Sequence, residues 1–318
     1  MLKCFTEDSL KVMKLSVVIP VYNEQEVINK FYDKLKEITL NISYELIFID
    51  DGSTDNTLEI LKNIYKEDKK NIKIISFSRN FGKEAAMYAG LKSSRGKYTV
   101  IIDADLQQNP KYILEMIKFL DENNDYCSIC MIQKKARVFK NIFYKLMNKI
   151  TNIDIINGAS DFRMFRRNVV ENILLLSEKD RFSKGIFSWV GFKTYYQEYE
   201  VQERKGGKSK WPFIKLMRYA IDGIINFSSV PLRIPAYLGF ISTILSFIYF
   251  IIVLILMLSG ININFNISLI SFIIIFTSGI ELISISIIGE YLFKVFNETK
   301  NRPIFIAKEK IGFDENLL

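Results

Sequence analysis

The 318-residue sequence contains no histidine, only three cysteines and only six prolines. The absence of histidine excludes Ser-His-Asp triads, histidine general bases and histidine-ligated zinc. Three cysteines are too few for a disulfide framework. No Gly-x-Gly-x-x-Gly fingerprint follows the first apolar run and no P-loop motif is present, so the usual phosphate cradles of dinucleotide enzymes and P-loop NTPases are excluded.

The composition is that of a folded chain with a strongly apolar part. Hydrophobic residues make up 49% and charged residues 25%, which excludes a disordered or fibrous protein. The net charge of +8 suits nucleic acid, an anionic membrane or a phosphorylated substrate. Because no nucleic-acid-binding motif accompanies the charge, we expect no nucleic-acid partner.

Short β-branched runs alternate with helical patterns along the first two-thirds of the chain, which predicts a doubly wound α/β sheet. Apolar residues recur at helical spacing in two intervening segments, from Ile28 to Ile38 and from Leu58 to Tyr65. The runs that read as buried parallel strands are Leu15–Pro20, Glu45–Asp50, Ile72–Phe77 and Tyr98–Asp103.

Polar residues follow these runs, at the strand ends where open α/β sheets bind ligands. The last run leads into the sequence Asp-Ala-Asp-Leu-Gln. On an extended backbone alternate residues share a face, so Asp103, Asp105 and Gln107 can converge on a hard divalent cation. An acidic pair can also merely end a strand, and the spacing alone leaves both interpretations open.

The C-terminal third has a long stretch without charge. From Ile234 to Ile280 there are 47 residues and no charged side chain. The stretches Ile234–Ser259 and Ile267–Ile288 each exceed the ~20 residues that span a bilayer. Basic residues lie outside the pair at both ends, so the positive-inside rule places both flanks and both termini in the cytoplasm. Two buried core helices are the alternative.

The segment before the first predicted span is basic and partly apolar. Six basic residues and no acidic residue lie between Arg204 and Arg218. Trp211–Ser229 has the composition of an amphipathic helix at a membrane surface, and the basic residues suit lipid anchoring, phosphate binding or both. We therefore expect a catalytic domain over residues 1–210, an amphipathic juxtamembrane segment over 211–233, two transmembrane helices within 234–293 and a cytoplasmic tail over 294–318.

Four motifs in order carry a resemblance to a known family. They are Val17–Glu24, Ile49–Thr57, Ser78–Leu91 and Asp103–Gln107. Together they resemble the inverting nucleotide-sugar glycosyltransferases with the GT-A (Rossmann-like) fold. The segments Gly158–Arg167 and Arg204–Lys210 and the two predicted spans narrow the resemblance to the polyprenyl-phosphate glycosyltransferases. The sequence departs from that pattern after Gln107, where Gln108-Asn109-Pro110 replaces the common Asp-Pro.

The resemblance implies a role for each matching residue. The nucleotide would contact Pro20, Tyr22, Glu24, Asp51 and Asp103. The metal, Mg²⁺ or Mn²⁺, would be held at Asp103, Asp105 and Gln107, and the acceptor phosphate at Arg204, Ser209 and Lys210. Asp161 matches a base or acceptor-orienting residue, and with Arg204 and Lys210 it completes the expected catalytic set. Lys83 either reaches a phosphate or lies at the start of a surface helix.

The implied function is metal-dependent transfer of a hexose from a nucleotide-sugar, a UDP-sugar by analogy, to polyprenyl phosphate with inversion. The expected partners are the donor, the lipid phosphate, membrane lipids and further copies of the chain in a homotetramer. The expected location is the inner (plasma) membrane. The alternatives are a membrane glycosyltransferase that acts on a glycan or another non-lipid acceptor, and a non-catalytic scaffold.

Overall fold

The computed structural model describes residues 13–39, 42–133, 156, 158–176, 178–179, 181–199, 248, 251–252, 255, 259 and 266–313. These residues fall into two compact units. The first unit contains every strand described below and helices α1, α2, α3, α4, α6 and α7, and the second contains helix α10 (Asn266–Thr299).

An eight-stranded mixed sheet forms the centre of the first unit, with the order β7-β5-β6-β4-β1-β2-β3-β8. β1, β2, β3 and β4 run parallel to one another, and β7 runs parallel to β5. β6 is antiparallel to β4 and β5, and β8 is antiparallel to β3. The strands are β1 (Leu15–Val21), β2 (Tyr44–Asp50), β3 (Ile72–Phe77), β4 (Tyr98–Ile101), β5 (Ser128–Gln133), β6 (Ala159–Arg166), β7 (Thr194–Tyr199) and β8 (Ala307–Ile311).

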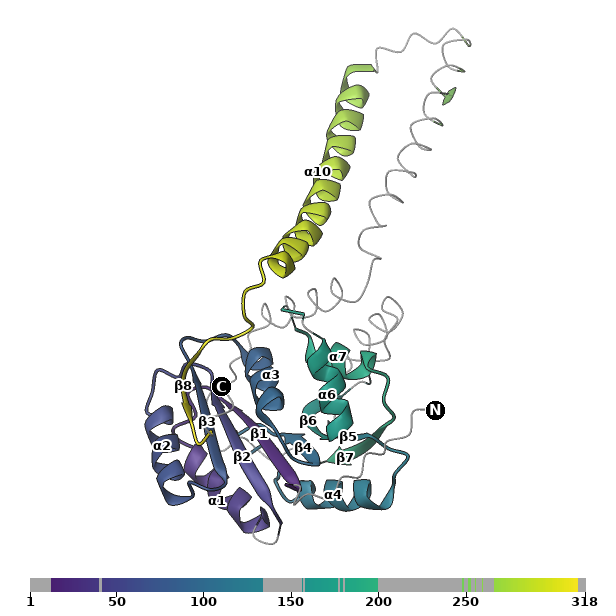
Figure 1. The fold of residues 1–318 in the computed structure, drawn as a ribbon. Coiled ribbons are helices and arrows are strands. Elements are labelled where there is room, and N and C mark those ends of the chain that lie inside the picture. Colours follow the sequence, from purple (N-terminus) through teal and green to yellow (C-terminus); the bar gives the residue numbers. More distant parts are fainter. Residues whose placement is uncertain are drawn as a thin grey trace. The chain divides into compact units, whose positions relative to one another are not determined.

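Helices cover both faces of the sheet (Figure 1). Residues of α1, α2 and α4 share one apolar core with one face, and α3 packs on the other. Alternation along β2 explains the two layers, because Leu46 and Phe48 belong to the first core and Ile47 and Ile49 to the second. The helices are α1 (Ile28–Thr39), α2 (Thr57–Glu67), α3 (Lys83–Ser93), α4 (Tyr112–Glu122), α6 (Arg167–Leu175) and α7 (Ser183–Trp189).

The predicted α/β class and the four predicted parallel strands are confirmed. The predicted strand end at Asp103 is wrong, because β4 stops at Ile101 and the following residues form turns. Leu106 within these turns has a φ of +62°, which an extended strand does not allow. The geometric premise that brought Asp103, Asp105 and Gln107 to one face of a strand therefore fails, and their joint role stays a prediction.

Helix α3 lies unusually close to the sheet. It presents small residues to β1 and β2, among them Ala86, Ala89 and Gly90. A Cβ atom at Gly90 would come within 2.1 Å of Cγ1 of the fully buried Val18. Only glycine at this position lets α3 pack as it does, and the position of the first turn of α3 depends on that packing.

The last strand completes the sheet at the edge of β3. β8 pairs with β3 from Ile74 to Phe77, and the Phe305 ring stacks on the Phe77 ring with 4.9 Å between centroids. Lys62 of α2 forms a 2.9 Å ion pair with Glu309. We expected no strand in this part of the chain.

Among the described residues, no helix is both long and apolar enough to cross a membrane. The two predicted C-terminal spans are thus not supported by the described part of the chain. Most of the first predicted span, Ile234–Ser259, and the whole of the predicted amphipathic segment 211–233 lie outside the described residues.

Candidate active site

The loops after β1 and β2 hold each other through side chains that bind backbone groups. The backbone N–H of Asn23 donates to Ser53 Oγ at 3.0 Å, and that of Glu24 donates to Thr57 Oγ1 at 2.9 Å. In return, the Thr54 N–H donates to Asn23 Oδ1 at 2.8 Å. Asn23 has a φ of +53°, a conformation that asparagine tolerates. Much of the polarity of these two motifs therefore serves to fix the loops at the carboxyl ends of the strands.

Asp51 fixes a third loop, the one that enters α3. Its carboxylate accepts the N–H of Phe81 at 2.7 Å and that of Gly82 at 3.0 Å. Asp51 is only 4% exposed, and burial raises the pKa of its carboxyl to about 6 although these two hydrogen bonds oppose the shift. Its neighbour Gly52 has a φ of +68°, and a Cβ there would lie 2.5 Å from the Arg79 carbonyl carbon. The ends of β2 and β3 are thus locked together.

The turn after β4 presents Asp103. The Gln108 side chain grips this residue twice: its Oε1 accepts the Asp103 N–H and its Nε2 donates to Asp103 Oδ2, both at 3.0 Å. Gln108 is 6% exposed, so both bonds are shielded from water. In the same turn the Gln107 N–H donates to Asp105 Oδ1 at 3.1 Å.

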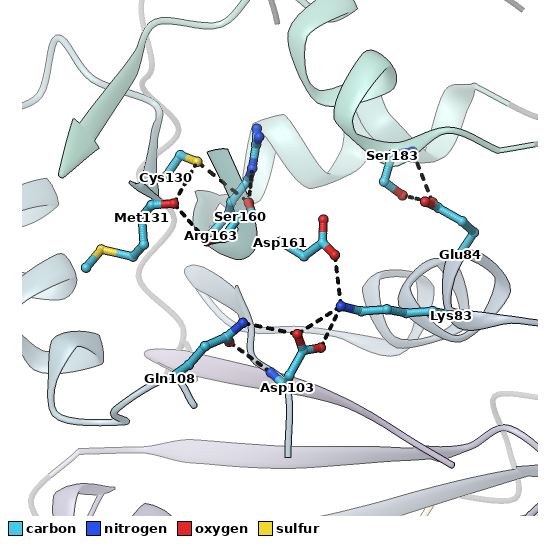
Figure 2. Close-up of polar contacts among 10 residues, drawn as sticks. All are labelled: Lys83, Glu84, Asp103, Gln108, Cys130, Met131, Ser160, Asp161, Arg163 and Ser183. Atoms are coloured by element: carbon cyan, nitrogen blue, oxygen red, sulfur yellow. Dashed lines mark hydrogen bonds and ion pairs between the residues drawn. The ribbon is translucent and has the colours of Figure 1, made fainter. Parts of the chain in front are cut away.

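Lys83, the first residue of α3, joins the carboxylate of Asp103, in the turn after β4, to that of Asp161 on β6 (Figure 2). Its ammonium lies 2.7 Å from Asp103 Oδ1 and 2.9 Å from Asp103 Oδ2. The same ammonium lies 2.8 Å from Asp161 Oδ2. The side chains of Lys83, Asp103 and Asp161 are 32%, 26% and 22% exposed, so the trio is accessible to a ligand.

Asp161 is held from within β6. The adjacent Ser160 donates to the Met131 carbonyl at 2.7 Å, and its own carbonyl accepts from Arg163 Nε at 2.9 Å. Burial alone would raise the pKa of Asp161, but the charges of Lys83 and Lys184 and the Lys83 hydrogen bond outweigh it and lower that pKa. Conversely, burial would lower the pKa of Lys83, and the two carboxylates raise it. Asp161 and Lys83 are therefore both charged at neutral pH.

Oxygen donors suited to a divalent cation occur on one turn. Asp103 and Asp105 supply carboxylates and Gln107 an amide oxygen, which is the donor chemistry of Mg²⁺ or Mn²⁺. Within the ranges that the structure describes, no group of three or more Cys, Asp or Glu side chains converges as a metal centre. The residues fit a hard cation in chemical type, and Asp103 is at present paired with Lys83.

Comparison with known proteins places the chain in a family. The family model described as "Glycosyl transferase family 2" matches residues 16–174. The chain is 38% identical to the uncharacterized glycosyltransferase YkcC of Bacillus subtilis (strain 168), over 96% of this chain and 97% of that protein. It is 39% identical to the prophage bactoprenol glucosyl transferase homolog of Escherichia coli (strain K12), over 93% of this chain and 99% of that protein. The chain belongs to glycosyl transferase family 2.

Two further similarities extend the comparison. The SfII prophage-derived bactoprenol glucosyl transferase of Shigella flexneri is 38% identical, over 93% of this chain and 98% of that protein. Among solved structures, glucosyl-3-phosphoglycerate synthase from Mycobacterium tuberculosis, in complex with Mn²⁺, UDP-glucose and phosphoglyceric acid, is 20% identical with a TM-score of 0.49. That similarity covers 67% of this chain and 78% of the other.

This family 2 chain has the family's Rossmann-like GT-A fold. Its described predicted site residues lie at the end of β1, in the segments that follow β1, β2 and β4, or on β6. The structure brings Asp103 and Asp161 together through Lys83. Pro20, Tyr22 and Glu24 lie on β1 and its following loop, and all three are partly exposed. The predicted acceptor residues Arg204, Ser209 and Lys210 lie outside the described residues.

Two contributions to the site were missed from the sequence. Gln108 was noted only as a departure from the family pattern, yet it holds Asp103 by both its amide atoms. For Lys83 the sequence predicts either a phosphate contact or a surface position, and neither includes its two ion pairs. The sequence signal for Gln108 was its place one residue after the Asp-x-Asp-x-Gln motif, where a buried polar side chain must find partners close by.

Proposed function

We propose that this family 2 glycosyltransferase transfers a hexose from a nucleotide-sugar, a UDP-sugar in the first instance, to polyprenyl phosphate with inversion. The names of its relatives support a lipid carrier as acceptor, because two that align over more than nine-tenths of this chain are named as a bactoprenol glucosyl transferase and as a homolog of one. The observation that carries the proposal in the structure is the Lys83 bridge, which joins the predicted donor side at Asp103 to the predicted acceptor side at Asp161.

Asp103, Asp105 and Gln107 are the residues that would hold a divalent cation. Bound there, Mg²⁺ or Mn²⁺ would supply positive charge to neutralise the nucleoside diphosphate as it leaves. The loops fixed by Asp51 and by the Asn23–Ser53 contact would form the nucleotide side of the site.

The acceptor needs little help to become a nucleophile. A phosphate monoester has its second pKa near 6, so it is largely ionised at neutral pH. Asp161 is ion-paired with Lys83, which makes its carboxylate a weak proton acceptor. We therefore assign Asp161 to orientation of the acceptor or sugar, and Arg204, Ser209 and Lys210 to the acceptor phosphate.

The proposed acceptor sets the location of the reaction. A polyprenyl chain stays in the bilayer, so its phosphate is available only at the interface. The charge-free run of 47 residues and the basic segment before it support attachment to the inner (plasma) membrane, with the catalytic domain in the cytoplasm. Assembly as a homotetramer is part of the proposal and rests on the family resemblance.

The test uses the full chain in detergent with Mn²⁺, undecaprenyl phosphate and a panel of radiolabelled nucleotide-sugars. We expect label to enter the organic phase, and we expect this transfer to stop with EDTA and to fall by at least about a hundredfold in Asp105→Asn. Asp33→Asn, which removes an exposed carboxylate on α1, is the matched control and should keep its activity.

Other results would select the alternatives. Metal-dependent nucleotide binding without lipid product, but with label on an added glycan, would move the acceptor from the lipid to a glycan. Absence of nucleotide binding would overturn the hypothesis that the protein is an enzyme and would favour a non-catalytic scaffold that has kept the fold.

A further inference from the structure

Lys83 occupies the position of a cation between two carboxylates. Its ammonium contacts both oxygens of Asp103 and one oxygen of Asp161, at 2.7–2.9 Å. Without it, two negative side chains would face each other in a site only about a quarter exposed. Like charges at such separations repel strongly, so the ammonium stabilises the arrangement of both carboxylates.

The backbone on both sides of Lys83 is fixed. The preceding Gly82 donates its N–H to the buried Asp51, and its φ of +98° sets the entry into α3. The following Glu84 accepts hydrogen bonds from the N–H and the hydroxyl of Ser183, the first residue of α7 (Figure 2). Lys83 is therefore aimed at the carboxylates by contacts on either side, and only its flexible stem is left to move.

Asp103 is fixed as firmly as Lys83. Gln108 binds its N–H and one carboxylate oxygen, so the carboxylate cannot turn away when its cation changes. A divalent ion that binds Asp103 needs the same oxygens that the ammonium now contacts. The Lys83 ammonium and a divalent ion cannot both contact the Asp103 oxygens without strong repulsion between the two cations.

We propose that Lys83 is a resident counter-ion that competes with the divalent ion for Asp103, and that it retains Asp161 when the divalent ion takes Asp103. This inference rests on the metal site of the proposed function and adds a positioning residue to it. Lys83 reduces the negative charge of the empty site and keeps it ordered, at the expense of metal affinity. The ammonium is then left beside Asp161, on the side where the acceptor phosphate is expected.

The test measures Mn²⁺ binding directly, from the electron paramagnetic resonance signal of free Mn²⁺, with the full chain in detergent and no nucleotide. Lys83→Met removes the competing charge, so we expect Mn²⁺ to bind at least about fivefold more tightly than to wild type. Lys83→Arg keeps the charge and should stay within about twofold of wild type. Lys92→Met, on the exposed side of the last turn of α3, is the control and should match wild type.

A kinetic readout separates this role from a purely structural one. In Lys83→Met we expect the KM for Mn²⁺ to fall together with kcat, whereas simple loss of folded protein would lower kcat alone. If the thermal midpoint of Lys83→Met drops, Lys83→Gln replaces it in the same measurements.

The failures are distinguishable. Wild type that binds Mn²⁺ and transfers sugar, beside a folded Lys83→Met or Lys83→Gln with unchanged or weaker Mn²⁺ binding, overturns the role of Lys83 and leaves the proposed function standing. If neither wild type nor folded Lys83→Met binds Mn²⁺, the metal site is overturned and this inference with it.

Discussion

At the scale of single residues, the buried Asp51 carboxylate binds the backbone N–H groups of Phe81 and Gly82. Burial raises the pKa of its carboxyl to about 6 from an ordinary value of 3.8. The folded chain therefore binds this proton more tightly than the unfolded chain. The resulting contribution to stability is complete below about pH 4 and is lost as the pH rises to about 6.

Asp51→Asn should remove that pH dependence. We expect the thermal midpoint of wild type to fall relative to that of Asp51→Asn between pH 4 and pH 6, and the difference to stay constant from pH 6.5 to 8. Asp33→Asn controls for the loss of one negative charge. Parallel midpoint curves for wild type and Asp51→Asn would contradict the raised pKa.

Asp161 gives a second prediction at this scale. If it orients a ligand and does not remove a proton, Asp161→Asn keeps the shape of the side chain and should cost less than about tenfold in transfer rate. Asp161→Ala removes the shape as well and should cost more. A loss of about a thousandfold or greater in Asp161→Asn would return Asp161 to the role of general base.

At the scale of elements, β8 is a strand that the sequence pattern did not predict. Its five residues alternate between partly buried and exposed positions and include three charges, a pattern typical of a protected edge strand. Its anchor lies just before it, where Phe305 stacks on Phe77 and packs beside Ile304.

Phe305→Ala should therefore loosen the edge of the sheet. We expect a loss of about 1–3 kcal/mol in stability, less than for a fully buried phenylalanine because Phe305 is only partly buried. Ile306→Ala is the matched control, since Ile306 is 53% exposed and should change stability by less than about 0.5 kcal/mol. Denaturation in urea measures the free energy of unfolding of both variants. Equal losses would show that the ring stack contributes little to stability.

Some elements could be predicted from the sequence and others could not. β1 to β4 were predictable because each is a run of apolar and β-branched residues buried on both faces. β6 was not predicted as a strand, although its alternation places Phe162 and Met164 in the core and Asp161 at the site. Lys83 could be placed at a helix start from its motif, but its contact with both Asp103 and Asp161 depends on the close packing of α3, which no local pattern encodes.

At the scale of the whole molecule, the candidate site is assembled from segments far apart in the chain. The loops near residues 23, 51 and 82 and the turn at 103–108 meet because parallel strands present their carboxyl ends at one edge. Strand β6 runs antiparallel to β4, so its N-terminal part, with Asp161, lies at the same edge. The motifs could be recognised singly, and the sheet order explains why they act together.

The position of β8 in the chain has a consequence for biosynthesis. β3 is made early, and its outer edge receives its partner only after residues 307–311 have been translated. Throughout that interval the N–H and C=O groups of β3 are an open template for pairing with another strand. We expect a chaperone that covers this edge during synthesis to be more important for correct folding of this protein than for a sheet whose strands all come first.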